Sequence, residues 1–190
     1  MEKEHTSRPD IRAALYRSPA GELCVGEIDG RICLCDWTRG TGHPRPGVLK
    51  RLLRHTGARE IIVDKAPASA LLREAFRQLD AYFSGTLTEF TLPVLMAGTP
   101  FQRRIWERLL LIPYGSAIRY ADLCPESPER TRAAANAVGA NPMSIILPCH
   151  RVCRKPGSGT THTGYAGGIQ AKMELLRLEA TVSQGESDGC

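Results

Sequence analysis

Short apolar segments separated by turn residues mark the first part of the chain. Residues 15–18, 23–27 and 31–37 are the three segments, and turn-forming residues at 19–21 and 29–30 separate them. Because the turns are short, consecutive segments can pair directly with one another. The pattern therefore predicts three strands joined as an antiparallel hairpin or meander.

Helical spacing of apolar residues takes over after a Gly- and Pro-rich loop at residues 40–47. The strongest example is the segment from Pro67 to Ser84, where Pro67 suits the first turn and Gly85 suits the position just past the end. We also predict three weaker elements, which are a helix over 48–55, a strand over 61–63 and a strand over 90–93.

A clear helix start follows a break in composition at residues 97–98. Thr99 can cap the free backbone N–H groups, Gln102 can reach back to complete a capping box, and Pro100 takes a first-turn position. Pro113 ends this helix. Its predicted buried stripe consists of Phe101, Ile105, Trp106 and Leu109.

Two short helices are expected next, over 120–123 and from Ser127-Pro128 to about residue 139. Two helices joined by a tight turn form the outline of a helix-turn-helix. The apolar run 145–147 is predicted to be a buried strand that leads directly into residues 148–152, which include Cys149 and His150.

A long loop over 154–168 and a closing helix over 169–180 complete the pattern. The elements predict an α/β (α+β) fold with an N-terminal antiparallel sheet and helices, followed by a winged-helix-like helix-turn-helix domain that carries Cys149. We divide the chain into an N-terminal support domain (1–97), a C-terminal domain (98–181) and a polar tail (182–190).

Composition narrows the setting of the protein. The 190 residues are 42% hydrophobic and 24% charged, and the longest purely aliphatic run, at 109–112, is far too short to cross a membrane. We expect no secretory signal, because the charged N-terminus has no apolar stretch behind it. The seven cysteines show no small-scaffold disulfide pattern, which predicts reduced thiols in the cytoplasm, or in the nucleus of a eukaryote.

The basic excess is concentrated in the second half of the chain. Residues 101–180 hold 11 Lys and Arg against 6 Asp and Glu. A polyanionic partner would therefore dock on this part of the protein. A basic surface without any partner would have the same composition, so charge alone does not decide the function.

The adjacent pair Cys149 and His150 is the candidate for chemistry. A cysteine reacts as its thiolate, which needs a base or a positive neighbour near neutral pH. His150 can be that base, and Glu179 can fold back to fix its tautomer. Neighbouring side chains on an extended chain point in opposite directions, so a contact needs a turn or a bridging water. A buried structural cysteine is the alternative explanation.

Four segments resemble parts of a known family. Residues 141–152, Asn-Pro-Met-Ser-Ile-Ile-Leu-Pro-Cys-His-Arg-Val, resemble the active-site signature of the O6-alkylguanine-DNA alkyltransferases, the methylated-DNA–protein-cysteine methyltransferases. Residues 98–102 and 164–168 resemble flanking motifs of that family, and residues 18–21 resemble its first hairpin turn. The resemblance runs in order through the second half of the chain and is weaker in the first half.

The resemblance implies DNA repair by direct reversal. The protein would move an alkyl group from O6-alkylguanine, and also from O4-alkylthymine, in double-stranded DNA onto its own Cys149. The target base would be flipped out of the duplex, and the acceptor would be used only once. The resemblance implies no metal, no organic cofactor, no membrane, a monomer, and a cytoplasmic protein associated with the nucleoid.

Five residues match the catalytic set of the family. Cys149 resembles the acceptor, His150 would deprotonate it through a water, and Glu179 would orient His150. Asn141 resembles the hinge between the recognition helix and the cysteine segment. Tyr120 resembles the tyrosine that helps rotate the target nucleotide and donates to guanine N3.

The resemblance also implies a DNA-contacting helix. Arg132 resembles the arginine that fills the gap left by the flipped nucleotide, and the small residues around it would let the helix approach the minor groove closely. Without the resemblance, those alanines would be a helix-packing face. The DNA-contacting residues are expected to be Thr131, Arg132, Ala133, Ala135, Asn136, Tyr120 and Arg151. The substrate pocket is expected to comprise Tyr165, Ala166, Val152 and Val138.

Two other functions compete with this interpretation. A lesion binder without transfer activity would resemble the alkyltransferase-like proteins, but those replace the acceptor cysteine, which Cys149 retains. A thiol hydrolase using Cys149 and His150 would need an oxyanion hole, for which the sequence shows no clear motif. Some relatives hold zinc in the N-terminal domain, but Cys24, Cys33 and Cys35 fit no common zinc spacing, so we expect no metal.

Overall fold

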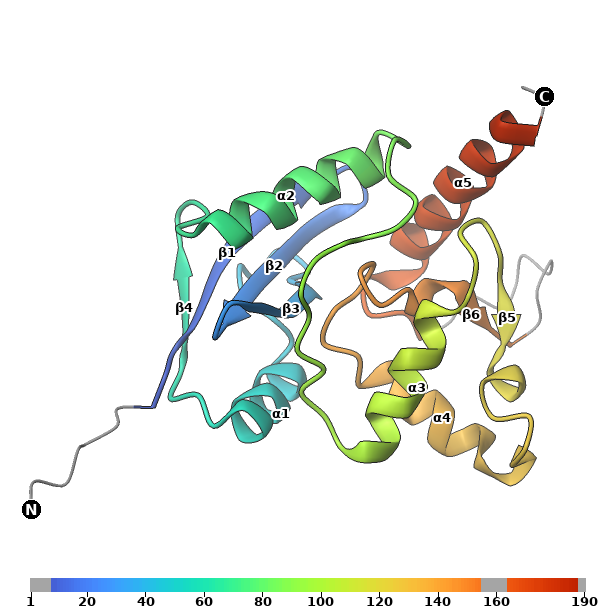
Figure 1. Ribbon diagram of the computed structural model, residues 1–190, viewed down its shortest axis with the longest axis horizontal. Coiled ribbons are helices and arrows are strands. Elements are labelled where there is room, and N and C mark those ends of the chain that lie inside the picture. Colours follow the sequence, from blue (N-terminus) through green and yellow to red (C-terminus); the bar gives the residue numbers. More distant parts are fainter. Residues whose placement is uncertain (1–7, 155–163, 188–190) are drawn as a thin grey trace, which may run out of the picture.

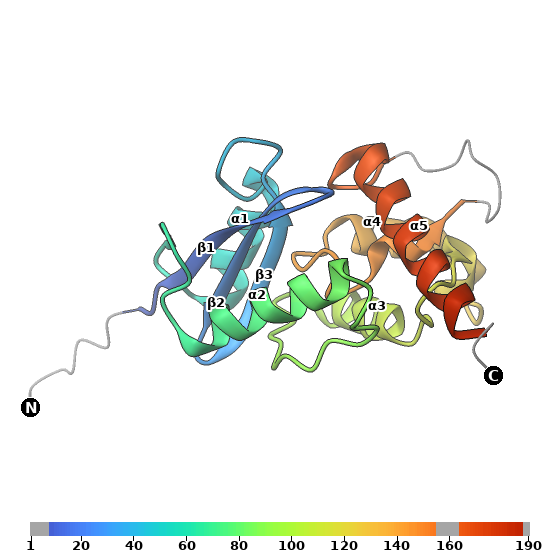
Figure 2. The same ribbon diagram turned by 90° about the horizontal axis from the view of Figure 1, so that it is seen from above.

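The computed structural model describes residues 8–154 and 164–187, and Figure 1 shows a mixed α/β architecture. The elements are β1 (Ile11–Ser18), β2 (Gly21–Ile28), β3 (Arg31–Trp37), α1 (Pro46–Thr56), β4 (Ile61–Asp64), α2 (Ala70–Phe83), α3 (Pro100–Leu110), β5 (Ile118–Arg119), the 3₁₀ turns η1 (Tyr120–Leu123) and η2 (Pro128–Arg130), α4 (Thr131–Gly139), the 3₁₀ turn η3 (Cys149–Arg151), β6 (Val152–Cys153) and α5 (Gly168–Ser187). The sheet with α1 and α2 lies on one side, and α3, α4 and α5 gather on the other (Figures 1 and 2). The predicted fold class is confirmed.

The N-terminal sheet has the strand order β3-β2-β1-β4. The first three strands are antiparallel, as predicted, whereas β4 pairs in parallel with β1. Successive side chains of β2 face opposite sides of the sheet. Leu23 and Val25 pack in one apolar cluster with Leu79 of α2, and Cys24 packs in a second cluster with Leu52 of α1. The two helices therefore cover opposite faces of the sheet.

Helix α2 begins later than predicted. Its N-cap is Ser69, whose hydroxyl accepts the backbone N–H of Leu72 at 3.0 Å, so Pro67 lies before the helix and not in its first turn. A serine hydroxyl satisfies a free N–H of the first turn, which fixes the start at this point. The predicted role of Gly85 just past the end is confirmed, because it adopts a left-handed φ of 76°.

The capping box at the start of α3 is confirmed. Thr99 Oγ1 accepts the N–H of Gln102 at 3.2 Å, and Gln102 Oε1 accepts the N–H of Thr99 at 2.9 Å. From the buried face of α3, the indole of Trp106 donates to the carbonyl of Ala137 at 2.8 Å. This hydrogen bond ties α3 to α4.

The segment between α3 and α4 is less helical than predicted. Residues 120–123 form a 3₁₀ turn, and the helix expected from Ser127 is divided into the 3₁₀ turn η2 and then α4. The hydroxyl of Thr131 donates to the carbonyl of Pro128 at 2.7 Å, and this local bond stabilises the tight turn before α4.

Two predicted strands are wrong. Residues 90–93 form no strand; the chain there makes only a bridge from Val94 to Ile32, since Pro93 has no N–H for a ladder. Residues 145–147 are buried as expected but form a turn, in which Ile145 has a left-handed φ of 72°. A short buried apolar run does not reveal by its pattern whether it is extended.

The C-terminal limits also differ from the prediction. The closing helix, expected over 169–180, extends to Ser187 as α5, so most of the predicted polar tail is helical. Most of the predicted loop over 154–168 lies outside the described residues, as does Cys190.

Candidate active site

Cys149 is the first residue of η3 and follows a buried turn. The side chain of Asn141, just after α4, holds this turn: its amide donates to the carbonyl of Leu147 at 2.9 Å, and its Oδ1 accepts the N–H of Met143 at 2.9 Å. Cys149 is 7% exposed, and its side chain lines a cavity of about 70 Å³. The turn therefore places Cys149 in the wall of a cavity.

Glu179 of α5 is the centre of a buried network behind Cys149. His150 Nε2 lies 2.7 Å from Glu179 Oε1, and the guanidinium of Arg151 donates to both carboxylate oxygens at 2.9 and 3.0 Å. The hydroxyl of Tyr82 and the backbone N–H of Gly115 donate to the same carboxylate at 2.8 and 3.1 Å. The structure thus brings His150 and Glu179 together, as expected from the sequence.

The protonation states in this network follow from its geometry. Burial would raise the pKa of Glu179, but the hydrogen bonds and charges of His150 and Arg151 outweigh burial and bring it to about 2. Burial lowers the pKa of His150, although Glu179 opposes this effect. We therefore assign a neutral imidazole that donates from Nε2 to an ionised carboxylate. Nδ1 of His150 is then an acceptor, and it has no hydrogen-bond partner among the described residues.

Different parts of the environment of Cys149 have opposing effects on the pKa of its thiol. Burial raises the pKa of the thiol, whereas a hydrogen bond from Asn141 and the charges of Lys172 and Arg45 lower it. Burial is the larger effect, so the resting cysteine carries its proton near neutral pH. A reaction at this sulfur therefore requires a base, and the free Nδ1 of the adjacent residue His150 is chemically suited to that role.

The cavity at Cys149 is built from distant parts of the chain. Five of the expected pocket or DNA-contacting residues line it, namely Tyr120, Ala135, Val138, Tyr165 and Ala166. Val152 does not line the cavity among the described residues; it is fully buried, and its carbonyl accepts a hydrogen bond from Lys172 at 2.6 Å.

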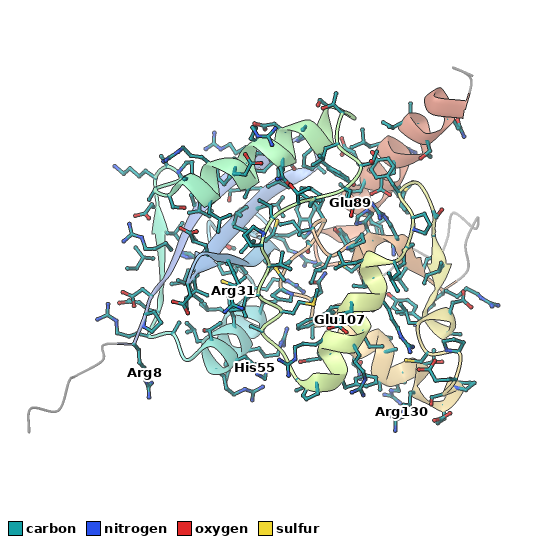
Figure 3. The ribbon with its side chains drawn as sticks, viewed as in Figure 1. Arg8, Arg31, His55, Glu89, Glu107 and Arg130 are labelled. Atoms are coloured by element: carbon teal, nitrogen blue, oxygen red, sulfur yellow. The ribbon has the colours of Figure 1, made fainter. Side chains whose placement is uncertain are left out.

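Helix α4 has two distinct faces. Ala134 and Ala137 are buried against α3, which agrees with a packing face for part of the helix. Arg132, Ala133 and Asn136 are exposed, and Thr131 and Ala135 are half-buried. Figure 3 shows Arg130, the residue before the helix, at the edge of the molecule. On the exposed face, the long side chain of Arg132 stands beside the small side chain of Ala133.

The expectation that Arg151 contacts DNA is wrong. This side chain is 7% exposed, and its guanidinium is bound to Glu179 and donates to the carbonyl of Ile112 at 2.7 Å. A buried arginine with a carboxylate partner cannot reach a phosphate without breaking that pair. Arg151 instead holds the carboxylate that orients His150.

Several site residues were missed in the sequence. Lys172 lines the cavity from α5 and is 2% exposed. It lies on the helix face that carries Leu175 and Glu179, so a lysine on an otherwise buried stripe was a usable signal. Arg45 also lines the cavity, from the loop before α1, and Tyr82 reaches Glu179 from α2. Arg45 and Tyr82 come from the N-terminal half of the chain, and no local sequence pattern indicates that they reach the site.

Two observations concern membranes and metals. Across residues 8–154 and 164–187, no helix has the length and apolar character needed to cross a membrane. In the same residues no group of three or more His, Cys, Asp or Glu side chains is arranged to hold a metal ion. Cys24, Cys33 and Cys35 are buried free thiols.

Comparisons with known proteins agree with this architecture. Residues 11–96 match the family model described as "6-O-methylguanine DNA methyltransferase, ribonuclease-like domain", and residues 100–181 match the model of its "DNA binding domain". The chain therefore belongs to the 6-O-methylguanine DNA methyltransferase family. The resemblance seen in the sequence is confirmed, and with it the class of enzyme.

Individual relatives share this assignment. The methylated-DNA–protein-cysteine methyltransferase of Mycobacterium leprae is 44% identical over 60% of this chain and 68% of its own length. That of Mycobacterium tuberculosis (strain H37Rv) is 47% identical over 55% of this chain, and the match spans 63% of the relative. The crystal structure of Mycobacterium tuberculosis OGT in complex with DNA superposes with a TM-score of 0.71 at 33% identity, covering 90% of this chain and 94% of that one.

Proposed function

We propose that this protein repairs double-stranded DNA by transferring the alkyl group of O6-alkylguanine, and of O4-alkylthymine, to the sulfur of Cys149. The observation that carries the proposal is the position of Cys149 on a cavity wall next to the buried pair of His150 and Glu179. The relatives' names and the DNA complex of a structural neighbour support DNA as the partner.

The proposed reaction begins with proton transfer. Nδ1 of His150 accepts the thiol proton of Cys149 through a bridging water, and Glu179 stabilises the resulting imidazolium. The thiolate attacks the alkyl carbon, the bond from that carbon to O6 breaks, and the electron pair leaves with the guanine. Tyr120 donates the proton that neutralises the leaving guanine at N3 and regains one from solvent, while the imidazolium of His150 returns its proton to solvent; burial raises the pKa of Tyr120, so its hydroxyl is protonated before the reaction.

The acceptor is used once in this proposal. A thioether sulfur is not displaced from its alkyl group by water under ordinary conditions, so Cys149 is not regenerated. The pathway requires neither a metal nor an organic cofactor. The chain of residues that it uses consists of Cys149, His150, Glu179 and Tyr120, with Asn141 as the residue that positions the cysteine turn.

Helix α4 is the proposed contact with DNA. A guanine inside a duplex does not expose O6 for in-line attack, so the nucleotide has to be rotated out at a cost of about a few kcal/mol. Arg132 projects from the exposed face of α4 and fills the resulting gap, while Ala133 and Asn136 allow a close approach to the minor groove. Thr131 and Ala135 flank this surface.

We further propose the division of labour that the sequence indicates. Residues 98–181 bind DNA and carry the acceptor, and residues 1–97 support them. The protein acts as a monomer in the cytoplasm, where it is associated with the nucleoid.

The test is to incubate the protein with a duplex containing O6-methylguanine and to map methyl groups on its peptides. A methyl group on the peptide that contains Cys149 is expected. A Cys149→Ser variant is expected to bind the same duplex without acquiring the methyl group. Binding by the parent without any methylated peptide would leave only a lesion binder, and release of free methanol would indicate a hydrolase.

A further inference from the structure

The N-terminal half of the chain contacts two walls of the acceptor cavity through a short segment that begins with the last two residues of β3 and continues into the loop before α1. This segment, from Asp36 to Arg45, we call the clamp segment. At one end, the buried carboxylate of Asp36 binds the guanidinium of Arg45 at 2.8 Å, and Arg45 Nη2 donates to the carbonyl of Asn141 at 3.5 Å. Asn141 shapes the cysteine turn, so this contact ties the clamp segment to the floor of the cavity.

The other contacts hold the roof of the cavity, which Tyr165 and Ala166 form. The indole of Trp37 donates to the hydroxyl of Tyr165 at 3.2 Å, and the two rings meet edge to face with centroids 6.1 Å apart. Gly167 lies so close to this indole that an added Cβ would come within 2.7 Å of it. The backbone of the roof residues therefore packs directly against Trp37 at the end of β3.

Arg39 makes the second contact with the roof. Its Nε donates to the carbonyl of Ala166 at 2.9 Å, and its Nη2 donates to the carbonyl of Tyr165 at 3.5 Å. Arg39 has a left-handed φ of 52°, a conformation that is unfavourable for a residue with a side chain. Backbone strain of this kind persists where surrounding contacts require it and is concentrated at functional sites.

The size of the cavity makes the roof important. Its volume is about 70 Å³, so little room is left beside Cys149 once a base with its alkyl group lies there. The positions of the roof residues Tyr165 and Ala166 therefore set how much room the alkyl group has. The larger the alkyl group, the further they have to move.

We propose that Trp37 and Arg39 are specificity-determining positioning residues, which limit the size of the alkyl group accepted by fixing the roof over Cys149. The inference rests on the proposed function, because it concerns which groups reach that sulfur. Neither side chain touches the reacting atoms; each acts through Tyr165 or Ala166. A looser roof admits bulky groups more easily while changing the fit of a methyl group little.

The experiment uses two variants and one matched control in the full chain. Trp37→Phe keeps a ring but removes the donor to Tyr165, and Arg39→Gly removes the guanidinium while allowing the left-handed backbone. Asp29→Gly is the control, since Asp29 is also exposed and left-handed, with a φ of 50°, but lies in the turn between β2 and β3. Rates of transfer are measured from duplexes that contain O6-benzylguanine or O6-methylguanine.

Both clamp variants are expected to raise the ratio of benzyl to methyl transfer roughly threefold or more, the scale of one hydrogen bond. Asp29→Gly is expected to leave the ratio unchanged. Equal ratios in all four proteins, or equal losses of both rates in the clamp variants, would overturn the inference.

Amide hydrogen exchange separates this inference from the proposed function. In both clamp variants, exchange at residues 165–168 is expected to accelerate relative to the parent and to Asp29→Gly. If exchange at residues 165–168 is unchanged in both variants, the inference is refuted even when the protein transfers alkyl groups. Faster exchange in the variants, in a protein that transfers neither the benzyl nor the methyl group, would support the restraint of the roof by Trp37 and Arg39 and refute the proposed alkyl transfer.

Discussion

Replacing Glu179 with Gln tests the buried network behind the acceptor cysteine. The side chain is 0% exposed and receives hydrogen bonds from His150, Arg151, Tyr82 and the backbone of Gly115. Glutamine has nearly the same shape but no charge, and its amide nitrogen is a donor that faces other donors. The variant therefore leaves the buried Arg151 guanidinium without its counter-charge.

The size of the effect follows from the pKa of Glu179. Burial opposes ionisation, but His150 and Arg151 outweigh it and lower the pKa from 4.5 to about 2. That lowering corresponds to about 3 kcal/mol, which is also the scale for breaking a buried ion pair. A carboxylate with a lowered pKa stabilises the fold above its unfolded pKa, and this contribution disappears as the pH falls towards its folded pKa.

The assay is urea denaturation of the parent and of Glu179→Gln at several pH values. We expect a difference in unfolding free energy of about 3 kcal/mol near pH 7, which narrows between about pH 4.5 and pH 2. Glu174→Gln, on the exposed face of the same helix, is the control and should change stability by less than about 0.5 kcal/mol. A gap that stays constant from pH 7 down to pH 3 would refute the ionised network.

Three further predictions follow from other contacts. Arg45→Gln should raise the pKa of Cys149 and shift the pH–rate profile of transfer to higher pH, whereas a purely structural role would lower the rate equally at every pH. Thr99→Ala should lower the unfolding free energy by about 1 kcal/mol through loss of the cap on α3, measured by denaturation. Arg132→Ala should slow transfer from duplex about tenfold or more but leave transfer from a single strand unchanged; Arg130→Ala is its matched control, and equal slowing on both substrates would argue against the gap-filling role.

Local signals in the sequence predicted much of the fold. The turns after β1 and β2, the capping box of Thr99 and Gln102, and the helical stripe of α2 each depend on neighbours in the chain. The pairing of His150 with Glu179 was expected from chemistry and from the family resemblance, because no local pattern links residues on separate elements.

The failures involve interactions between distant segments. Ile145 is apolar and β-branched, which suggests a strand, but the Asn141 side chain and the bridge from Met143 to β3 impose a turn there. Arg151 was expected among the DNA-contacting residues, and only the three-dimensional position of Glu179 explains its burial. Arg45, Trp37 and the other N-terminal contacts to the cavity were invisible for the same reason.

The most direct test of the central claim is the stoichiometry of transfer measured on the intact protein. With O6-methylguanine duplex in large excess, the account predicts that the protein mass increases by a single methyl group, that the increase resides on the Cys149 sulfur, and that repair stops when all molecules carry it. Continued repair beyond one lesion per protein molecule, or a methyl group on any other residue, would contradict it.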